Sequence, residues 1–285
     1  MKKLLLPLFL ILTGSISFGQ NRFNPIFKPS HENVKGKVKS VQYSLYNASE
    51  KLGEAIKSDL EKSHLEKYNN GKVTEESHFS GSNLILERLT FEYDQKGNLI
   101  SEIKFNSNGK IFERLVYSYD KNGYLSELVN FNSDSLIETK TIYKNDANGN
   151  VIEEKDYNAN GILFDSYTYK YDDKGNMIEE VDFNGAGIQN DRYTYKYDDK
   201  GNLIENCIYN SSNVLYDKFT YVYDDKGNVI EESDINSDGV VFRKNSYKYH
   251  YDANNNWTKR IKFNIINEKH KNADSIEEIK IEYFQ

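Results

Sequence analysis

Apolar and polar positions recur along this chain with a period of 26 residues. A glycine marks each repeat, and apolar residues lie two and eight positions after it, from Val73 to Val229 and from Phe79 to Ile235. The glycines are Gly71, Gly97, Gly123, Gly149, Gly175, Gly201 and Gly227. Because several equivalent positions recur with the same spacing, the sequence indicates a tandem array of a single supersecondary unit.

Within each repeat the local period is two, which predicts β-strands. In residues 193–197 tyrosines alternate with polar side chains, so one face of this strand is aromatic. Residues 198–202 (Asp-Asp-Lys-Gly-Asn) then provide a turn, and a second turn such as Asn160-Gly161 closes the other end of the hairpin. Each repeat is therefore predicted to be a hairpin, and connections this short favour a meander.

The predicted fold is all-β: tandem antiparallel β-hairpin repeats form one elongated, open or gently coiled meander sheet of about 16 strands with atypical terminal caps. The expected divisions are a signal peptide at residues 1–19, an N-terminal extension at 20–33, an N-terminal capping unit at 34–70, seven hairpin repeats at 71–252 and a C-terminal capping unit at 253–285. A polar insertion at about residues 48–62 of the first cap is expected to be helical.

The pairing register across the first turn has two solutions. If residues 199–201 form a three-residue turn with a bulge, Tyr197 faces Leu203 and Tyr195 faces Glu205, and a hydroxyl–carboxylate contact is expected there. A four-residue loop shifts the pairing by one residue and places Ile204 beside the tyrosines. Gly201 favours the bulged turn, because this turn needs a residue with positive φ.

Composition narrows the class of protein. An aromatic content of 14% argues against intrinsic disorder, and a mean hydropathy of −0.77 argues against several membrane spans. Residues 1–19 contain two lysines, an apolar run and then small residues, which predicts a secretory signal peptide cleaved before Gln20. Losing those lysines changes the net charge from −7 to −9, which argues against nucleic-acid binding. The single Cys207 excludes an intramolecular disulfide.

The turn sequences resemble the YD repeat of the RHS/YD-repeat family. Copies of Tyr-Asp-Asp-Lys-Gly-Asn followed by an apolar pair lie at residues 171–178, 197–204 and 223–230, and related copies lie at 93–100 and 119–125. The resemblance covers roughly residues 65–263 and implies exported or surface-located hairpin arrays, which in large members curl into a shell around a toxin or serve in adhesion. It suggests a short exported protein of a Bacteroidetes-like bacterium. Asn in place of Arg after the glycine departs from the family pattern.

The aromatic face is the candidate ligand-binding surface. Tyrosine rings at strand spacing stack on sugars while their hydroxyls form hydrogen bonds, and the alternative is that these rings are the packing layer of the sheet. The residues concerned are Tyr169, Tyr193, Tyr195, Tyr197, Tyr221 and Tyr223.

Candidate metal and catalytic residues are few. Asp234, Asn236 and Asp238 match the start of a calcium loop, although they also lie in register with the ordinary second turn. The repeated glutamates are expected to lie on a solvated face or to pair across strands with Lys and Arg, because an active site should interrupt the repeat once. No cofactor is expected. The histidines, which show no metal-ligand spacing, are His31, His64, His78, His250 and His270.

These features predict an exported, non-enzymatic β-repeat protein that binds or scaffolds at the cell envelope or outside the cell. The expected partner is a glycan or an envelope protein, with neither nucleic acid nor a transmembrane segment involved. Periplasmic, outer-surface and secreted locations all fit the signal peptide. One alternative is an RHS-type toxin-associated shell fragment or partner. Another is an envelope enzyme, which requires a residue cluster that departs from the repeat, with the insertion at 48–62 as the best place for it.

Overall fold

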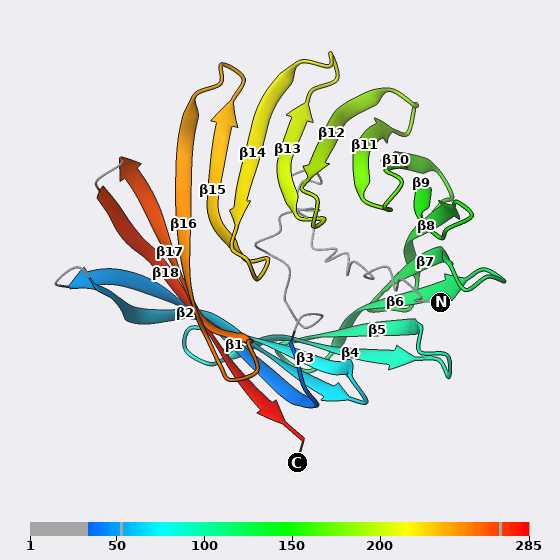
Figure 1. Cartoon of the computed structure of the whole chain (residues 1–285). Helices are drawn as coiled ribbons and strands as arrows, with labels where there is room; N and C mark the ends of the chain where they lie inside the picture. The colour runs from blue at the N-terminus through cyan, green and yellow to red at the C-terminus, as the bar shows by residue number, and fades with distance from the viewer. Residues whose placement is uncertain (1–33, 52–53, 268–269, 285) are drawn as a thin grey trace.

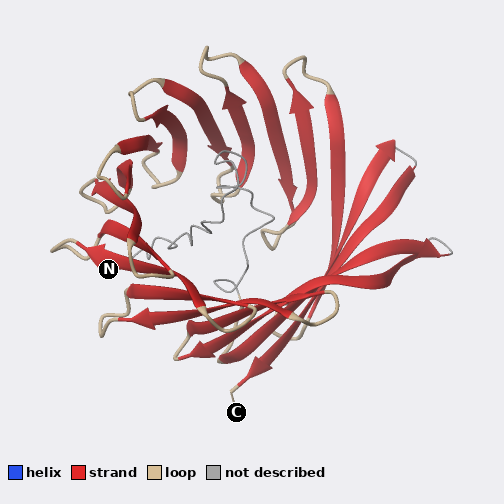
Figure 2. Cartoon of the chain, turned by 180° about the vertical axis from the view of Figure 1, so that it is seen from behind, coloured by secondary structure: helices blue, strands red, loops and turns tan. Residues whose placement is uncertain are grey.

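The computed structural model describes residues 34–51, 54–267 and 270–284 of the 285-residue chain. The predicted signal peptide (1–19) and N-terminal extension (20–33) lie outside these residues. Every element of regular secondary structure in the described part is a β-strand. Short turns join the strands at the two rims of the sheet (Figure 2).

The strands follow one another along the chain with short connections. They are β1 (Val38–Lys51), β2 (Glu54–Asn69), β3 (Lys72–Ser80), β4 (Ile85–Tyr93), β5 (Leu99–Asn106), β6 (Ile111–Tyr119), β7 (Leu125–Asn132), β8 (Ile137–Asn145), β9 (Val151–Asn158), β10 (Leu163–Tyr171), β11 (Met177–Asn184), β12 (Gln189–Tyr197), β13 (Leu203–Tyr209), β14 (Leu215–Tyr223), β15 (Val229–Asn236), β16 (Val241–Tyr251), β17 (Trp257–Asn267) and β18 (His270–Tyr283).

The sheet is a closed barrel. Each strand pairs antiparallel with its neighbours in sequence, as the hairpin meander predicted, and β1 also pairs with β18 through residues such as Val41 and Ile281. The ring of strands is visible in Figure 1. The prediction of an open or gently coiled sheet was therefore wrong, and the described residues form 18 strands rather than about 16.

The closure has a local cause that recurs around the ring. Every pair of neighbouring strands contains a register shift, for example between Lys196 and Tyr197 in β12 and between Asp234 and Ile235 in β15. A bulge bends the strand that carries it and increases the local twist. Since the bulges repeat at both ends of each hairpin, they curve every repeat in the same way, and β18 meets β1.

The turn residues set these bulges. Gly201 has a φ of 84°, and its N–H donates to the carbonyl oxygen of Asp198 at 3.0 Å. The Asp198 carboxylate accepts hydrogen bonds from the N–H groups of Lys200 (2.9 Å) and Asn202 (2.8 Å), and from the Asn202 side chain (2.8 Å). The same three contacts recur in the turns that begin at residues 146 and 172. The bulged three-residue turn predicted from the sequence is thus confirmed, together with the pairing of Tyr197 with Leu203.

The insertion at about residues 48–62 forms strand, and its prediction as a helix was wrong. β1 and β2 continue as a hairpin beyond the barrel wall, with pairs that reach Lys51 and Glu54; residues 52–53 lie outside the described residues. An existing ladder of backbone hydrogen bonds extends at low cost, whereas a helix of this length needs its own nucleus. Residues 48–62 therefore extend the β1–β2 hairpin instead of forming a helix.

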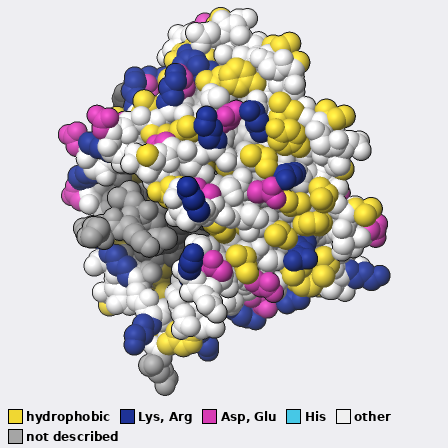
Figure 3. All heavy atoms as spheres, turned by 90° about the vertical axis from the view of Figure 1, so that its right-hand side faces the viewer, with side chains coloured by type: hydrophobic (Ala, Val, Ile, Leu, Met, Phe, Trp, Pro, Cys, Tyr) yellow, Lys and Arg dark blue, Asp and Glu magenta, His cyan; other side chains and the backbone are white. Residues whose placement is uncertain are grey.

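The packed core lies on the inner face of the barrel. Two clusters on this face are centred on Leu89 and Leu115, each 1% exposed, and on the tyrosines around Tyr195. The opposite face carries ion pairs such as Lys140–Glu127 (2.5 Å). Figure 3 shows Lys, Arg, Asp and Glu side chains spread over the outer wall, which identifies the charged face as the outer one. Side chains converge on the concave side of a sheet, so burial is greatest there.

The conformation of two turn glycines leads to a first prediction. Gly109 and Gly149 both have positive φ, 74° and 90°, so alanine costs about 1–2 kcal/mol at either position. A Cβ at position 109 meets nothing within 4 Å, whereas at position 149 it lies 2.4 Å from the Tyr124 ring. Gly149→Ala should therefore lower the free energy of unfolding more than Gly109→Ala does. Urea unfolding of both variants checks this, and equal losses would contradict the contact with Tyr124.

Candidate functional sites

The six tyrosines of the predicted ligand surface lie on the packed inner face. Four of them (Tyr169, Tyr193, Tyr195 and Tyr221) are at most 7% exposed. The other two, Tyr197 and Tyr223, are half-buried, and their hydroxyls donate to the carbonyl oxygens of Met177 (2.8 Å) and Leu203 (2.6 Å). The structure thus places the six rings as the packing layer of the sheet, the alternative that the sequence left open. Whether they also bind a ligand stays a prediction.

The inner tyrosines form a repeated hydrogen bond to buried glutamates. Tyr195 on β12 donates to Glu180 on β11 at 3.3 Å, whereas the sequence predicted a partner on β13. The prediction of Glu205 as its partner was wrong, because the bulge next to Tyr197 shifts the register and pairs Tyr195 with Asn206. Equivalent bonds with the same 15-residue separation are Tyr117 to Glu102 (3.2 Å), Tyr169 to Glu154 (2.7 Å) and Tyr247 to Glu232 (2.9 Å).

These buried pairs perturb their protonation equilibria. Burial raises the pKa of Tyr195 well above its ordinary value, and the negative charge of Glu180 adds to this shift. Burial also raises the pKa of Glu102 to about 7, although Lys104 and the Tyr117 hydroxyl oppose the effect. The pairs are therefore most stable when the hydroxyl is neutral.

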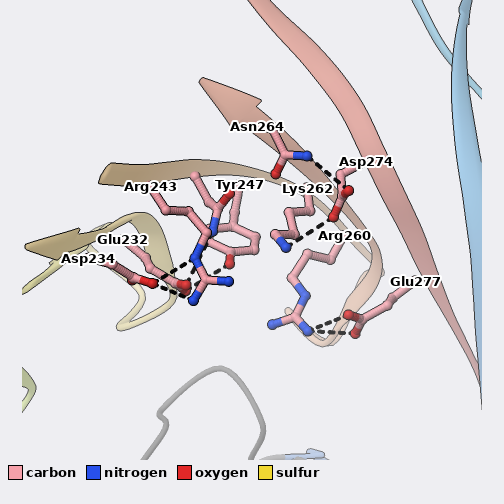
Figure 4. Close-up of polar contacts among 10 residues, drawn as sticks. Glu232, Asp234, Arg243, Tyr247, Arg260, Lys262, Asn264, Asp274 and Glu277 are labelled. Atoms are coloured by element: carbon pink, nitrogen blue, oxygen red, sulfur yellow. Dashed lines mark hydrogen bonds and ion pairs between the residues drawn. The ribbon is translucent and has the colours of Figure 1, made fainter. Parts of the chain in front are cut away.

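The calcium candidate lies beside a network of inner-face ion pairs on β15–β18 (Figure 4). Asp234 accepts from Arg243 Nε at 2.6 Å. The Asn236 side-chain oxygen accepts from the backbone N–H groups of Asp238 (3.1 Å) and Val240 (2.9 Å), as in the other second turns. Asp234 Oδ2 and the side-chain oxygen of Asn236 thus already have protein partners, and the turn interpretation accounts for the motif.

One rim of the barrel exposes a ring of large apolar side chains, which we call the apolar rim. It lies at the seven turns that join β3 to β4, β5 to β6 and so on to β15 and β16. These side chains make up 15 of the 21 large hydrophobic residues exposed in the described part of the chain. They are Leu84, Ile85, Leu86, Ile111, Phe112, Leu136, Ile137, Ile162, Phe164, Ile188, Val214, Tyr216, Val240, Val241 and Phe242. Figure 3 shows hydrophobic side chains gathered in a band on the outer wall.

The two rims differ in charge as well. The seven connections of the apolar rim contain three charged residues, Lys110, Asp134 and Asp238. The seven connections at the opposite rim that begin at residues 94, 120, 146, 172, 198, 224 and 252 contain fifteen. The barrel is therefore amphipathic along its axis.

Basic residues follow the apolar rim on the outer wall. They recur every 26 residues, with serine at position 166, and several form ion pairs with glutamates of the preceding strand. These pairs are Arg88–Glu75 (3.3 Å), Lys140–Glu127 (2.5 Å), Arg192–Glu179 (3.5 Å), Lys218–Glu205 (2.5 Å) and Lys244–Glu231 (2.6 Å). Exposed pairs of this kind stabilise a fold by about 0–1 kcal/mol each, so they are easily rearranged.

A second feature lies on β2 and β3, where the repeat is interrupted. His64 pairs directly with His78 across the two strands, and Glu66 pairs directly with Glu76. One ligand atom each of His64, Glu66 and Glu76 lies within 4.8 Å of the others. His78 Nε2 lies 2.8 Å from a Glu76 oxygen. The four side chains form a mixed imidazole–carboxylate cluster, which we call the His/Glu cluster.

Sequence reasoning missed this cluster, because it looked for spacing along one strand. The signal is distributed over two strands, as His-x-Glu at 64–66 and Glu-x-His at 76–78, and it appears once the strands are paired in antiparallel register. Glu66 occupies the column that Tyr195 occupies in its own hairpin, and His64 occupies the column of Tyr193. This is the kind of departure from the repeat that a special site was expected to show.

No family model and no curated protein matches the chain. Among solved structures, a porin-like protein from Bacteroides uniformis is 11% identical, with 86% of this chain and 96% of that chain covered and a TM-score of 0.45. A porin-like protein from Bacteroides vulgatus is also 11% identical, with 88% and 99% covered and a TM-score of 0.30. The structure of TcdB2-TccC3 is 13% identical over 82% of this chain but 15% of that chain, with a TM-score of 0.29.

The described residues contain no helix that is long and apolar enough to cross a membrane.

Proposed function

We propose that this chain is an exported, non-enzymatic binding or scaffolding module of the cell envelope that docks on a lipid surface through its apolar rim. The observation that carries the proposal is the ring of exposed aliphatic and aromatic side chains at one rim, where charged residues are scarce. Exposed apolar patches of this extent are typical of interaction sites. The proposal includes membership of the RHS/YD-repeat family, which rests on the turn motifs.

The shape of the rim favours a lipid surface over a protein partner. The ring spans β3 to β16, and strands spaced about 4.8 Å apart make this an arc of roughly 65 Å. A bilayer offers a continuous apolar surface that contacts all seven turns together. The basic residues behind the rim are placed to reach lipid phosphates while their aliphatic stems remain in the apolar layer.

The test is flotation of the mature chain, residues 20–285, with phosphatidylcholine vesicles. The chain should float with these vesicles, and less with anionic vesicles because its net charge is negative. Replacing three rim residues in the variant Leu136→Ser/Ile162→Ser/Ile188→Ser should lower the bound fraction at least about tenfold, the effect of about 1.4 kcal/mol. The matched control Ile178→Ser/Ile204→Ser/Val222→Ser changes exposed apolar residues near the opposite rim and should bind as the wild type does.

Two results would contradict the lipid proposal. One is a wild-type chain that stays in the aqueous fraction with every vesicle. The other is a rim variant that floats normally but loses a concentration-dependent dimer in analytical ultracentrifugation, since the apolar rim would then bind a second copy of the chain.

Closure of the sheet favours a second candidate, an RHS-type toxin-associated shell fragment or partner. In this role the barrel would bind a cargo protein encoded beside it and protect that protein from protease. Protection of such a cargo would persist in the rim variant, which separates this role from docking on lipid.

A further inference from the structure

The His/Glu cluster holds two carboxylates on directly opposed residues of neighbouring strands, on the inner face. Glu66 is 1% exposed, and it pairs with Glu76, which is half-buried. Like charges placed directly opposite each other in a sheet are destabilising. In the neighbouring repeats a tyrosine hydroxyl binds the equivalent glutamate, but the residue 15 positions after Glu76 is Phe91, which has no hydroxyl. A positive charge beside the two carboxylates offsets this repulsion, and the imidazoles of His64 and His78 are the nearest groups that can supply it or hold an ion that does.

Surrounding side chains position each of the three residues that converge. The Tyr43 ring stacks on His64 with a centroid distance of 4.3 Å. The Tyr68 hydroxyl donates to Glu66 Oε2 at 2.6 Å, and His78 Nε2 lies 2.8 Å from Glu76 Oε1. Metal ligands in proteins are commonly oriented in this way by an outer layer of hydrogen bonds and packing.

We propose that His64, Glu66 and Glu76 bind a divalent first-row metal ion of the Zn²⁺ class, and that His78 positions Glu76. Bonds of about 2.0–2.2 Å to one ion require ligand atoms no farther apart than about 4.4 Å. The observed separations of up to 4.8 Å close to this range by small side-chain rotations. An imidazole nitrogen among the ligands favours Zn²⁺ over Ca²⁺, which takes oxygen ligands.

The ion would link β2 to β3 next to β1, the strand that closes the barrel with β18. Metal binding to the folded state alone stabilises that state, so its effect appears as a rise in melting temperature. At a metal concentration of about 100 times Kd, the expected rise is about 5–10 °C.

The experiment uses the mature chain, residues 20–285, freed of metal with a chelator and titrated with ZnCl₂. Calorimetry should give one bound ion per chain, and the melting temperature should rise. Co²⁺ should replace Zn²⁺ and produce visible absorption bands typical of nitrogen and oxygen ligands. Glu76→Gln keeps the side-chain shape and should reduce Zn²⁺ affinity at least about tenfold. His250→Gln, which removes an exposed histidine, should leave the affinity unchanged.

Several results would overturn the proposal. They are the absence of a Zn²⁺-dependent rise in melting temperature, the absence of Co²⁺ bands in the wild-type chain, or the same affinity in Glu76→Gln as in the wild type. If Glu76→Gln does not fold, as judged by its circular dichroism, the wild-type Co²⁺ spectrum and a second variant, His64→Gln, decide the matter.

Discussion

Ending the chain at Asn267, which removes β18, is expected to abolish cooperative folding. β18 closes the ring between β17 and β1, and it contributes Ile276 (0% exposed) and Ile279 (6% exposed) to the core. Burying two such side chains stabilises the fold by about 3–6 kcal/mol. The loss is comparable with the whole stability of a typical domain, about 5–15 kcal/mol.

Two further consequences of this truncation act in the same direction. Arg260 on β17 would lose its ion pair with Glu277, whose two oxygens lie 2.5 and 2.6 Å from its guanidinium (Figure 4). β1 and β17 would also become edge strands, which recruit other chains. The truncated protein should therefore aggregate and show no cooperative thermal transition by circular dichroism.

A control removes two strands, β11 and β12, without opening the ring. Deleting residues 175–200 takes out one 26-residue repeat and joins Lys174 to Gly201, so the turn sequence is restored. β10 then pairs with β13, and a smaller closed barrel results. This variant should remain soluble and melt cooperatively. Cooperative melting of both variants would show that closure is not a major source of stability.

The repeats and hairpins were predictable because their signals are local. Gly201 and Asp198 lie within one turn, so the sequence alone predicts the positive φ and the bulged turn that the structure has. The alternation of Tyr193, Tyr195 and Tyr197 likewise depends on one strand. The prediction of an all-β hairpin meander is confirmed for the same reason.

Closure of the barrel depends on the total curvature of all the bulges, and the side-chain partners depend on the register between strands. Neither property can be read from the sequence of a single strand. Whether β18 meets β1 depends on the curvature added by every bulge, and no short segment of the sequence carries that total. The partner of Tyr195 depends on one extra residue beside Tyr197, which moves the contact from Glu205 to Glu180. The His/Glu cluster escaped for a related reason, because His64 and His78 become neighbours through pairing of β2 and β3.

Alkaline pH is expected to unfold the barrel sharply, at the pH where its tyrosines ionise. Burial raises the pKa of Tyr93, Tyr119 and Tyr197 to about 12, and burial next to a glutamate raises the pKa of Tyr195 and Tyr247 further. In the unfolded chain the tyrosine pKa is about 10. The raised values mean that the stability contributed by neutral tyrosine is fully present below pH 10 and is lost as the pH rises toward the folded values.

The magnitude follows from the number of deeply buried hydroxyls. Tyr117, Tyr195 and Tyr247 are each at most 9% exposed, and each lowers the free energy of unfolding by about 1.4 kcal/mol per pH unit above pH 10. Three such residues remove about 4 kcal/mol per pH unit. Tyrosinate absorbance and the β-sheet circular dichroism signal should therefore change together in one cooperative step between pH 10 and about 12.

A variant and an opposite outcome make this test specific. Tyr221→Phe keeps the buried ring, which is 6% exposed with its hydroxyl, and removes one ionising group, so the midpoint of alkaline unfolding should move to higher pH. Ionisation of most tyrosines near pH 10 while the β signal is intact, beyond the contribution of exposed ones such as Tyr216, would contradict the packing of the tyrosine face. The rings would then meet water in the folded protein, and the aromatic face would again be the leading ligand surface.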